Sequence, residues 1–459
     1  MKIKRRRFLV ESEANMKRLK VVLLGMIIMV LSVCVPQVCK ANASTESWDG
    51  TVDISWYKQE EESFLINSGK QLAGLAKLVN EGNDFAGKEI HLAKDIYLNN
   101  APLSTKNVWV PIGKGNDIED TAHSFQGEFY GDGYYIYNIY VPSTGLGGLF
   151  GCIGESGIVC DVVVSQGRCD SGGIIANINK GIIKFCSNNS IVGTTAYDVG
   201  GICNTNYNLV YGCENLGEVW GSSAAGIVGK NMEKLSTINQ CRNKGKVGSS
   251  SVSCGIVVAN MGWVYNCYNV GSLSDNFGTL NKARALMGIV DENNNKVLNC
   301  YSSCTYDYSE DDCWWVYGIS RDETENCFYY SEKTIGSGDA EKVDLEEMKK
   351  TSFVQKLLPQ TTDYNVVKSW NADEENSNSG LPVTDADIQR KNGTCKCQPE
   401  IWMTASVFEK EVGENYVTDI QFYYTETMPN IYFDNEELGW VSYDGDIKGG
   451  YIFLAFRKE

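Results

Sequence analysis

Histidine is almost absent from this chain of 459 residues, which contains two histidines, His91 and His123, and eight prolines. Neither histidine has a sequence neighbourhood typical of a catalytic triad or a metal centre. The alternation of His91 with Ile90 and Leu92 predicts an outward-facing strand residue instead. The sequence also lacks a phosphate-binding glycine loop, a His-Glu-x-x-His helix and a nucleophile elbow. We therefore expect a binding or scaffold protein without a catalytic site, rather than an enzyme.

Positively charged residues are also fewer than negatively charged ones. The chain has 41 lysines and arginines against 58 aspartates and glutamates, a formal net charge of −17. An acidic surface repels phosphate backbones and anionic lipid headgroups. This composition argues against nucleic acid as a partner. We expect glycans or proteins of a host or of the environment as partners instead.

Long apolar segments are missing except for one run of about 15 residues, Val21 to Val35. Lysines and arginines precede this run, and Ala41-Asn42-Ala43 follows it. The order of basic, apolar and small residues predicts a secretory signal peptide over 1–43, cleaved after Ala43. A retained anchor and lipid attachment at Cys34 remain alternatives. We expect an extracellular or cell-surface protein with no membrane insertion after cleavage.

Glycine and cysteine are abundant, with 46 and 17 residues, and they recur in a phrase. The phrase is Cys-x-Asn-x-Gly/Ser-x-aliphatic. It begins at Cys186, Cys213, Cys241 and Cys267, with degenerate copies at Cys300 and Cys327. A Gly-Ile pair precedes each copy, as at Gly201-Ile202 and Gly226-Ile227. A period near 27 residues is typical of one structural unit stacked on the next.

One period contains short apolar runs separated by glycine and asparagine, which predicts three short strands joined by tight turns. Stacking such units about 4.8 Å apart gives an all-β protein, a right-handed parallel β-helix (β-solenoid) of about eight coils. The cysteine of the phrase would point inward as a small apolar filler. The asparagine would form a hydrogen-bonded ladder with its copies in neighbouring coils.

The repeat cysteines are therefore expected to be buried and mostly unpaired. A disulfide among Cys300, Cys304 and Cys313 is a separate expectation, because these residues lie where the period loosens. Cys395 and Cys397 supply two zinc ligands at most, and no histidine lies near them, which argues against a zinc site.

Five segments follow from these patterns. They are the signal peptide (1–43), an N-terminal segment (44–83), the parallel β-helix (84–335), a closing segment (336–400) and a small C-terminal β domain (401–459). We expect a capping helix over 69–80 in the N-terminal segment. The closing segment is expected to contain a helix over 340–358 and a polar linker. The linker is expected to be the first site of proteolysis, because 371–400 has few apolar anchors.

Several passages resemble the GLUG-motif repeat proteins of bacterial cell surfaces. The passages are 64–99, Val108 to Gly113, 125–139 and 351–383, together with the string Gly148-Leu149-Phe150-Gly151. The resemblance spans about 64–383 and implies a secreted, right-handed β-helix that often forms part of a larger surface adhesin or enzyme. It implies no activity for the repeats, which serve as a scaffold.

Two groups of residues are candidates for binding. Asp291, Glu292 and Asp322 follow successive Gly-Ile pairs, and coil stacking would bring them together with Arg321 as a weak calcium site or as a solvated charged turn. Tyr134, Tyr135, Tyr137, Trp314 and Trp315 are candidate glycan-binding aromatics. The same stacked carboxylates leave a second class open, a polysaccharide lyase or glycoside hydrolase built on a β-helix.

Overall fold

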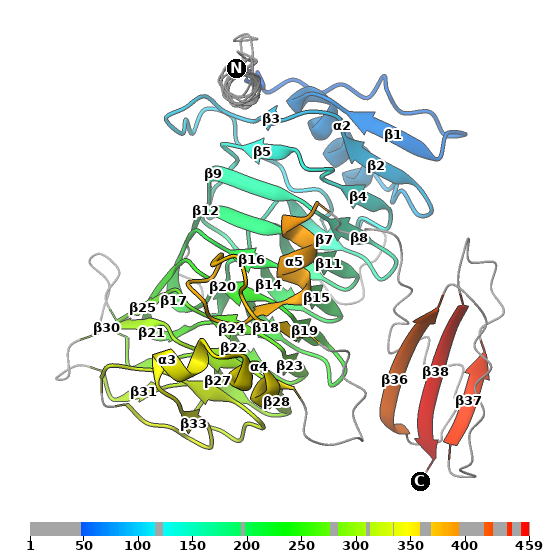
Figure 1. Ribbon diagram of the computed structural model, residues 1–459. Helices are drawn as coiled ribbons and strands as arrows, with labels where there is room; N and C mark the ends of the chain where they lie inside the picture. Colours follow the sequence, from blue (N-terminus) through cyan, green and yellow to red (C-terminus); the bar gives the residue numbers. More distant parts are fainter. Residues whose placement is uncertain are drawn as a thin grey trace, which may run out of the picture. The chain divides into compact units, whose positions relative to one another are not determined.

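The computed structural model describes residues 47–114, 123–193, 198–275, 283–308, 313–333, 335–358, 369–393, 417–425, 438–442 and 451–458. Within these ranges the protein is mostly β, and its main body is a parallel β-solenoid with three walls (Figure 1). The predicted signal peptide, Cys34, Cys395 and Cys397 lie outside the described residues. No described helix is long and apolar enough to cross a membrane.

The first wall contains nine parallel strands, one from each turn. They are β1 (Ser63–Ile66), β2 (Glu89–Leu92), β4 (Glu128–Tyr130), β8 (Ile158–Cys160), β11 (Ile182–Lys184), β15 (Leu209–Tyr211), β19 (Thr237–Asn239), β23 (Trp263–Tyr265) and β28 (Lys296–Leu298).

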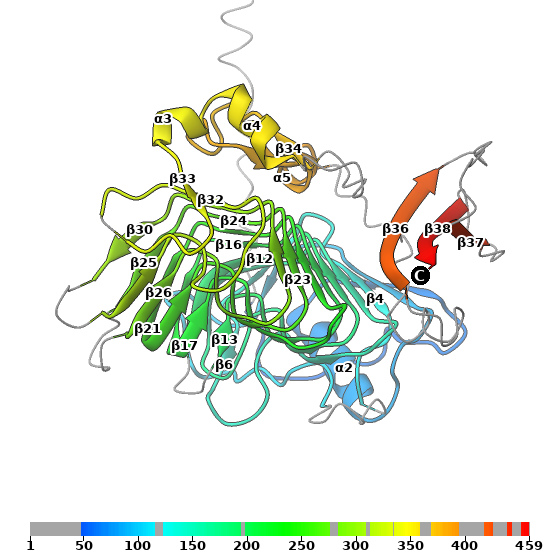
Figure 2. The ribbon, with the colours of Figure 1, turned by 90° about the horizontal axis from the view of Figure 1, so that it is seen from below.

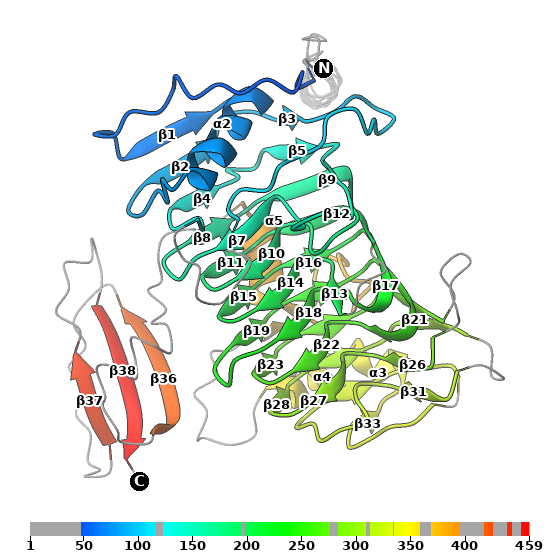
Figure 3. The same ribbon diagram turned by 180° about the vertical axis from the view of Figure 1, so that it is seen from behind.

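The second wall contains six parallel strands (Figure 3). They are β7 (Phe150–Ile153), β10 (Ala176–Asn179), β14 (Cys203–Asn206), β18 (Val228–Asn231), β22 (Val257–Asn260) and β27 (Val290–Asn293).

The third wall bends, so a single turn often contributes two strands to it. Its strands are β3 (Ile96–Tyr97), β5 (Tyr135–Tyr137), β6 (Tyr140–Val141), β9 (Val163–Cys169), β12 (Ser187–Gly193), β13 (Val199–Gly200), β16 (Glu214–Asn215), β17 (Glu218–Ala225), β20 (Arg242–Asn243), β21 (Lys246–Cys254), β24 (Tyr268–Asn269), β25 (Ser272–Ser274), β26 (Ala285–Met287), β29 (Tyr301–Ser302), β30 (Thr305–Asp307), β31 (Trp315–Tyr317), β32 (Phe328–Tyr329) and β33 (Glu341–Lys342).

The solenoid starts earlier than the repeat phrase indicates. β1 pairs in parallel with β2, so the first turn begins at Ser63 and the wall holds nine strands rather than the eight expected. Helix α2 (Gly69–Asn80) has the predicted bounds and is inserted between these two strands. Its N-cap residue Ser68 accepts a hydrogen bond from the backbone N–H of Gln71, and its Leu72, Leu75 and Val79 are fully buried. The early turns lack the cysteine phrase, which is why the period did not reveal them.

The stacked cysteines are confirmed. All six phrase cysteines are buried and free. The backbone N–H of Cys213, Cys241 and Cys267 lies 3.4 Å from the sulfur in the next turn, at Cys241, Cys267 and Cys300. The residue before each cysteine has a positive φ, for example Asn266 at 54° and Asn299 at 53°. Asparagine and glycine tolerate this left-handed corner better than other residues, which explains their frequency there.

The asparagine ladder is also confirmed. Asn188 donates to Asn215 at 2.7 Å, Asn215 to Asn243 at 2.8 Å, and Asn243 to Asn269 at 2.9 Å. A second ladder follows the second wall and was not predicted. It runs through Asn179, Asn206, Asn231, Asn260 and Asn293, with side-chain distances of 2.7–2.9 Å. Both ladders pair buried amides along the axis of the solenoid, where an unpaired amide is costly. Oδ1 of Asn179, at the start of the second ladder, has no partner among the described residues.

One cysteine expectation needs correction. Cys300, Cys304 and Cys313 are all free and buried, so no disulfide joins them. Cys300 belongs to the stacked column, and the Cys304 sulfur accepts a hydrogen bond from the Ser302 hydroxyl at 3.3 Å. Cys160, by contrast, is disulfide-bonded.

The closing segment differs from the single helix and linker expected from sequence. The helix expected over 340–358 is two short helices, α3 (Leu345–Met348) and α4 (Thr351–Leu357), because Lys350 between them has an extended backbone. The polar stretch then forms β34 (Trp370–Asn371), β35 (Val383–Thr384) and α5 (Asp385–Lys391). These elements lie along the outside of the third wall (Figure 2). Trp370, Leu381 and Val383 are buried.

Near the C-terminus, β36 (Val417–Thr425), β38 (Tyr451–Lys458) and β37 (Leu438–Ser442) form an antiparallel sheet in that order. The alternation of apolar and polar residues predicted strands here, and this part of the prediction is confirmed. The separation of 401–459 as a domain stays a prediction.

Candidate functional site

Two exposed tryptophans form the strongest candidate surface. Trp314 is 68% exposed and Trp315 is 44% exposed, although large apolar side chains are usually buried. Their rings are nearly perpendicular, with centroids 6.3 Å apart. The Arg284 guanidinium lies 6.0 Å from the ring centre of Trp314, and that of Arg321 lies 5.6 Å from the ring centre of Trp315. Each ring therefore has an arginine against it and still exposes a large part of its surface. We call these four residues the tryptophan corner.

The pairing of neighbouring strands in the third wall positions Trp315 at the tryptophan corner. Trp315 on β31 pairs with Ala285 on β26, which pairs with Val252 on β21. Beside this column a small apolar cluster, separate from the main core, fills the angle between the second and third walls. It comprises Ala225, Cys254, Val258, Ala285 and Met287, with Val252 and Tyr317 packed against it. The corner therefore rests on packed apolar side chains.

Asp291 brings a buried carboxyl group to the same corner. Its side chain is 6% exposed, and its Oδ1 lies 3.6 Å from Nε of Arg321, too far for a hydrogen bond. Oδ1 has no hydrogen-bond partner among the described residues. Burial raises the pKa of Asp291 to about 6, against the opposing effect of Arg321, and the nearby Glu292 and Asp322 add to the rise. Asp291 can therefore exchange a proton in mildly acidic solution.

The three predicted calcium residues have different surroundings. Glu292 is exposed, Asp291 faces Arg321, and Asp322 accepts a hydrogen bond from the backbone N–H of Asn293 at 2.8 Å. In the described part of the chain, no group of three or more His, Cys, Asp or Glu residues is arranged to hold a metal ion. The calcium site stays a prediction that this geometry does not favour.

The predicted tyrosines lie on β5 and just before it, on the third wall. The Tyr137 ring is nearly parallel to two neighbouring rings, with centroids 4.8 Å from Tyr97 and 5.5 Å from Tyr135. Tyr134 and Tyr135 are 37% and 38% exposed. Because the tyrosines stack on one another, they offer a ligand less open ring surface than the tryptophans do.

His91 lies on β2 and is partly exposed, as predicted, but it has acidic partners that the sequence did not reveal. Its Nδ1 lies 2.7 Å from Oδ2 of Asp132, and Nε2 lies 3.5 Å from Oε2 of Glu89. The ring stacks on Tyr130, whose hydroxyl contacts Glu128. His91 and Tyr130 are partners in the register of β2 and β4. Pairing these two strands from their alternation could have found the contact with Asp132.

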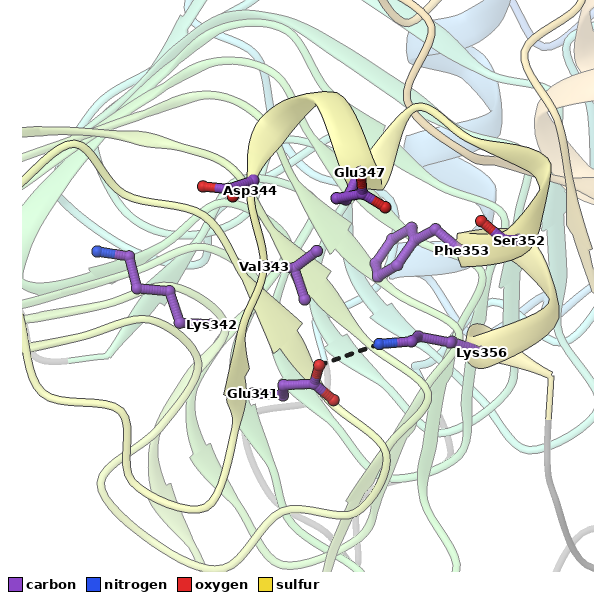
Figure 4. A pocket seen from close by; sticks show the side chains of 8 residues that line it. All are labelled: Glu341, Lys342, Val343, Asp344, Glu347, Ser352, Phe353 and Lys356. Atoms are coloured by element: carbon purple, nitrogen blue, oxygen red, sulfur yellow. Dashed lines mark hydrogen bonds and ion pairs between the residues drawn. The ribbon is translucent and has the colours of Figure 1, made fainter.

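A hollow of 230 Å³ lies beside α3 and α4 (Figure 4). Glu341 and Lys356 form an ion pair across it at 3.0 Å. Figure 4 shows that the side chains of Lys342 and Asp344 lie apart from this pair and from Phe353. Its charged groups do not converge, so we assign it no function.

A second group of buried charges attaches the closing segment to the solenoid. Arg242 donates to Glu214 at 2.8 Å and forms an ion pair with Asp387 of α5. Arg390 of α5 donates to the Ser187 hydroxyl at 2.7 Å and to the carbonyl of Gly212 at 2.6 Å. Burial alone would raise the pKa of Glu214, but the two arginines outweigh it and hold this pKa below its usual value. We call Glu214, Arg242, Asp387 and Arg390 the docking cluster.

Comparisons with known proteins add little to this geometry. No protein-family model matches the chain, and no curated protein matches it. Among solved structures, the chain is similar to a candidate immunoglobulin A1 protease from Bacteroides ovatus, with 15% identity and a TM-score of 0.42. That alignment covers 71% of this chain and 92% of the other. At this level the likeness carries no functional argument, so the function has to be argued from the surface itself.

Proposed function

We propose that the protein is a secreted or surface-exposed β-solenoid scaffold that binds carbohydrate at the tryptophan corner. The observation that carries this proposal is the exposure of Trp314 and Trp315 on a packed support. Holding two indoles in water is unfavourable by the hydrophobic effect, and a sugar ring can cover them by stacking its C–H face.

The polar groups around the indoles suit a saccharide. Arg284 and Arg321 donate hydrogen bonds in a planar arrangement, which matches sugar hydroxyl and carboxylate oxygens. The Asp291 carboxyl lies 3.6 Å from Nε of Arg321 and adds a negative charge beside that guanidinium. Aromatic faces with a few fixed polar groups beside them are the usual composition of a small-molecule binding site.

A glycan array followed by calorimetry tests this proposal. We expect at least one oligosaccharide to bind the purified protein. Trp315→Ala and Trp314→Ala should weaken that binding by about tenfold or more, since an aromatic contact contributes roughly 1–3 kcal/mol at such a site. Tyr135→Ala, on the stacked tyrosines, is the matched control and should retain binding. If binding survives both tryptophan variants and is lost in the tyrosine variant, the site lies on β5 instead.

The raised pKa of Asp291 favours a second candidate, a polysaccharide lyase or glycoside hydrolase. A carboxyl group with a pKa near 6 suits a general acid, and Glu292 follows it directly. Release of reducing or unsaturated sugars from plant and host polysaccharides would support this candidate. Loss of that release in Asp291→Asn and Glu292→Gln would assign it to this site, whereas glycan binding without release supports the scaffold.

A further inference from the structure

A larger, apolar hollow of 440 Å³ lies at the N-terminal end of the solenoid. It is formed by one face of α2, the segment 48–52 and the segment 106–114. Its apolar lining includes Trp48, Val52, Ala73, Ala76, Val108 and Trp109. This volume lies within the range of small-molecule binding sites, roughly 300–1,000 Å³.

The lining offers apolar contact that is open to solvent. Val52, Val108 and Val110 are 49%, 44% and 57% exposed, although they stand close together. Behind these valines, the buried rings of Trp48 and Trp109 meet edge to face with centroids 5.8 Å apart. A cluster of exposed aliphatic side chains around a concave site is a common sign of a ligand.

The polar groups of the lining are already occupied. The indole N–H of Trp48 donates to the Thr51 carbonyl at 2.7 Å, and that of Trp109 donates to the Leu149 carbonyl at 3.1 Å. Asn80 donates to the Pro111 carbonyl and accepts from the backbone N–H of Gly113, both at 3.0 Å. A sugar would find few free partners for its hydroxyl groups here. An aliphatic body fits this lining better than a saccharide does.

The rim is positively charged, although the whole chain has a net charge of −17. Lys77, Lys106 and Lys114 line the hollow together with one carboxylate, Glu81. Lys77 lies 3.9 Å from Glu81, and Lys114 donates to the Asn80 carbonyl at 3.2 Å. The Lys106 ammonium has no partner among the residues that the structure describes. The rim therefore carries more positive than negative charge and is complementary to an anion.

We propose that this hollow binds an amphiphilic anion, a long-chain carboxylate of the fatty-acid type. Its hydrocarbon chain lies against Val52, Val108 and Val110. Its carboxylate is held by Lys106, with Lys77 and Lys114 nearby. Such a site is separate from the tryptophan corner and does not depend on carbohydrate binding. It would give the protein a lipid-like ligand in addition to any glycan.

Displacement of a fluorescent fatty acid tests this site. Purified protein is titrated with dansyl-undecanoate, which is then displaced with dodecanoate, decanoate and dodecanol. We expect dodecanoate to displace the probe, decanoate to be weaker by about fourfold for each missing methylene group, and dodecanol to be weaker by about tenfold because it lacks the charge.

Variants locate the binding. Lys106→Glu and Val108→Asp should each weaken dodecanoate binding by about tenfold or more, whereas Lys106→Arg should retain it. Lys342→Glu, an exposed lysine beside the hollow next to α3, is the matched control and should bind normally. Absence of displaceable binding, equal affinity for dodecanol and dodecanoate, or indifference to Lys106→Glu would overturn the proposal. A dimer that Val108→Asp dissociates, without fatty-acid binding, would overturn it in favour of contact between two copies.

Discussion

Glu214 and Asp291 are both buried carboxyl groups beside an arginine, yet their surroundings shift their pKa values in opposite directions. Glu214 lies between Arg242 and Arg390 and accepts a hydrogen bond from the Ser187 hydroxyl, and its pKa is lowered. Asp291 has one arginine at 3.6 Å and an oxygen without a hydrogen-bond partner, and its pKa is raised to about 6.

This difference separates a structural site from a candidate binding site. In the docking cluster each buried charge is paired with an opposite charge of the protein. These pairs hold α5 against the third wall, and they leave no unpaired charge for a ligand to bind. The tryptophan corner leaves one carboxyl oxygen unsatisfied and two indoles exposed, at a cost in stability. A group that the fold does not satisfy is a reasonable place to look for a ligand.

The largest effect is expected from breaking the docking cluster. Glu214→Ala leaves Arg242 and Arg390 buried without their shared carboxylate and should lower the free energy of unfolding by about 3–5 kcal/mol. Urea denaturation measures the loss, and limited proteolysis should then cut within 369–393. The exposed pair Lys58–Glu61 provides the control, since Lys58→Ala should change stability by less than about 0.5 kcal/mol. A loss below about 1 kcal/mol for Glu214→Ala would show that the cluster does not hold the closing segment.

The two carboxyl groups should also give opposite dependences on pH. Between pH 3.8 and about 6 the folded protein binds more protons at Asp291 than the unfolded chain does. Stability should therefore fall as the pH rises through this window, by at most about 3 kcal/mol, and Asp291→Asn should abolish that slope. Glu214 contributes stability that is present above pH 4.5 and is lost as the pH falls below it. In thermal denaturation from pH 3 to 8, Glu214→Gln should remove only the acid-side loss, and identical profiles for both variants would contradict the assignment.

The stacked cysteines are buried like the two carboxyl groups, but they are uncharged and are stabilised by packing. Cys241 is fully buried, and its sulfur lies 3.4 Å from the backbone N–H of Cys213. Cys241→Leu should lower the free energy of unfolding by about 1–3 kcal/mol through overpacking. Thiol titration should label few cysteines in the native protein and many more in denaturant, because the twelve free cysteines that the structure describes are all buried. Ready labelling of the native protein would contradict the stacked column.

The smallest effect on stability is expected at the tryptophan corner itself. Trp314 is 68% exposed and contributes little to the core, so Trp314→Ala should change the free energy of unfolding by less than about 0.5 kcal/mol. Chemical denaturation checks this expectation. A large loss would assign the indole to the fold and weaken the argument that it is kept for binding.

Much of the solenoid could be predicted from the sequence, because parallel stacking repeats the same requirement at the same position in every turn. The cysteine column and the first asparagine ladder follow from one phrase. The second ladder also has a regular sequence pattern. An asparagine lies five residues after the glycine of most Gly-Ile pairs, as in Gly201 to Asn206 and Gly226 to Asn231. It was missed because it belongs to no conspicuous phrase.

The parts that could not be predicted depend on contacts between distant, non-repeated residues. Arg390 meets Ser187 across 203 positions, and Ala386 meets Gln240 across 146. No local pattern encodes such pairs. The polar composition of 371–400 therefore predicted a linker, although its described part packs on the wall. Trp314 and Trp315 were predicted as candidates from residue type alone. Their arginine partners and the buried state of Asp291 required the register of the second and third walls.

The central claim is that the tryptophan corner binds a ligand and the docking cluster does not. Calorimetric titration of an oligosaccharide selected on the array into wild type, Trp315→Ala and Glu214→Gln, at a temperature where all three are folded, tests it most directly. The predicted result is unchanged affinity for Glu214→Gln and a loss of about tenfold or more for Trp315→Ala. Equal affinities for all three proteins, or a loss confined to Glu214→Gln, would contradict the claim.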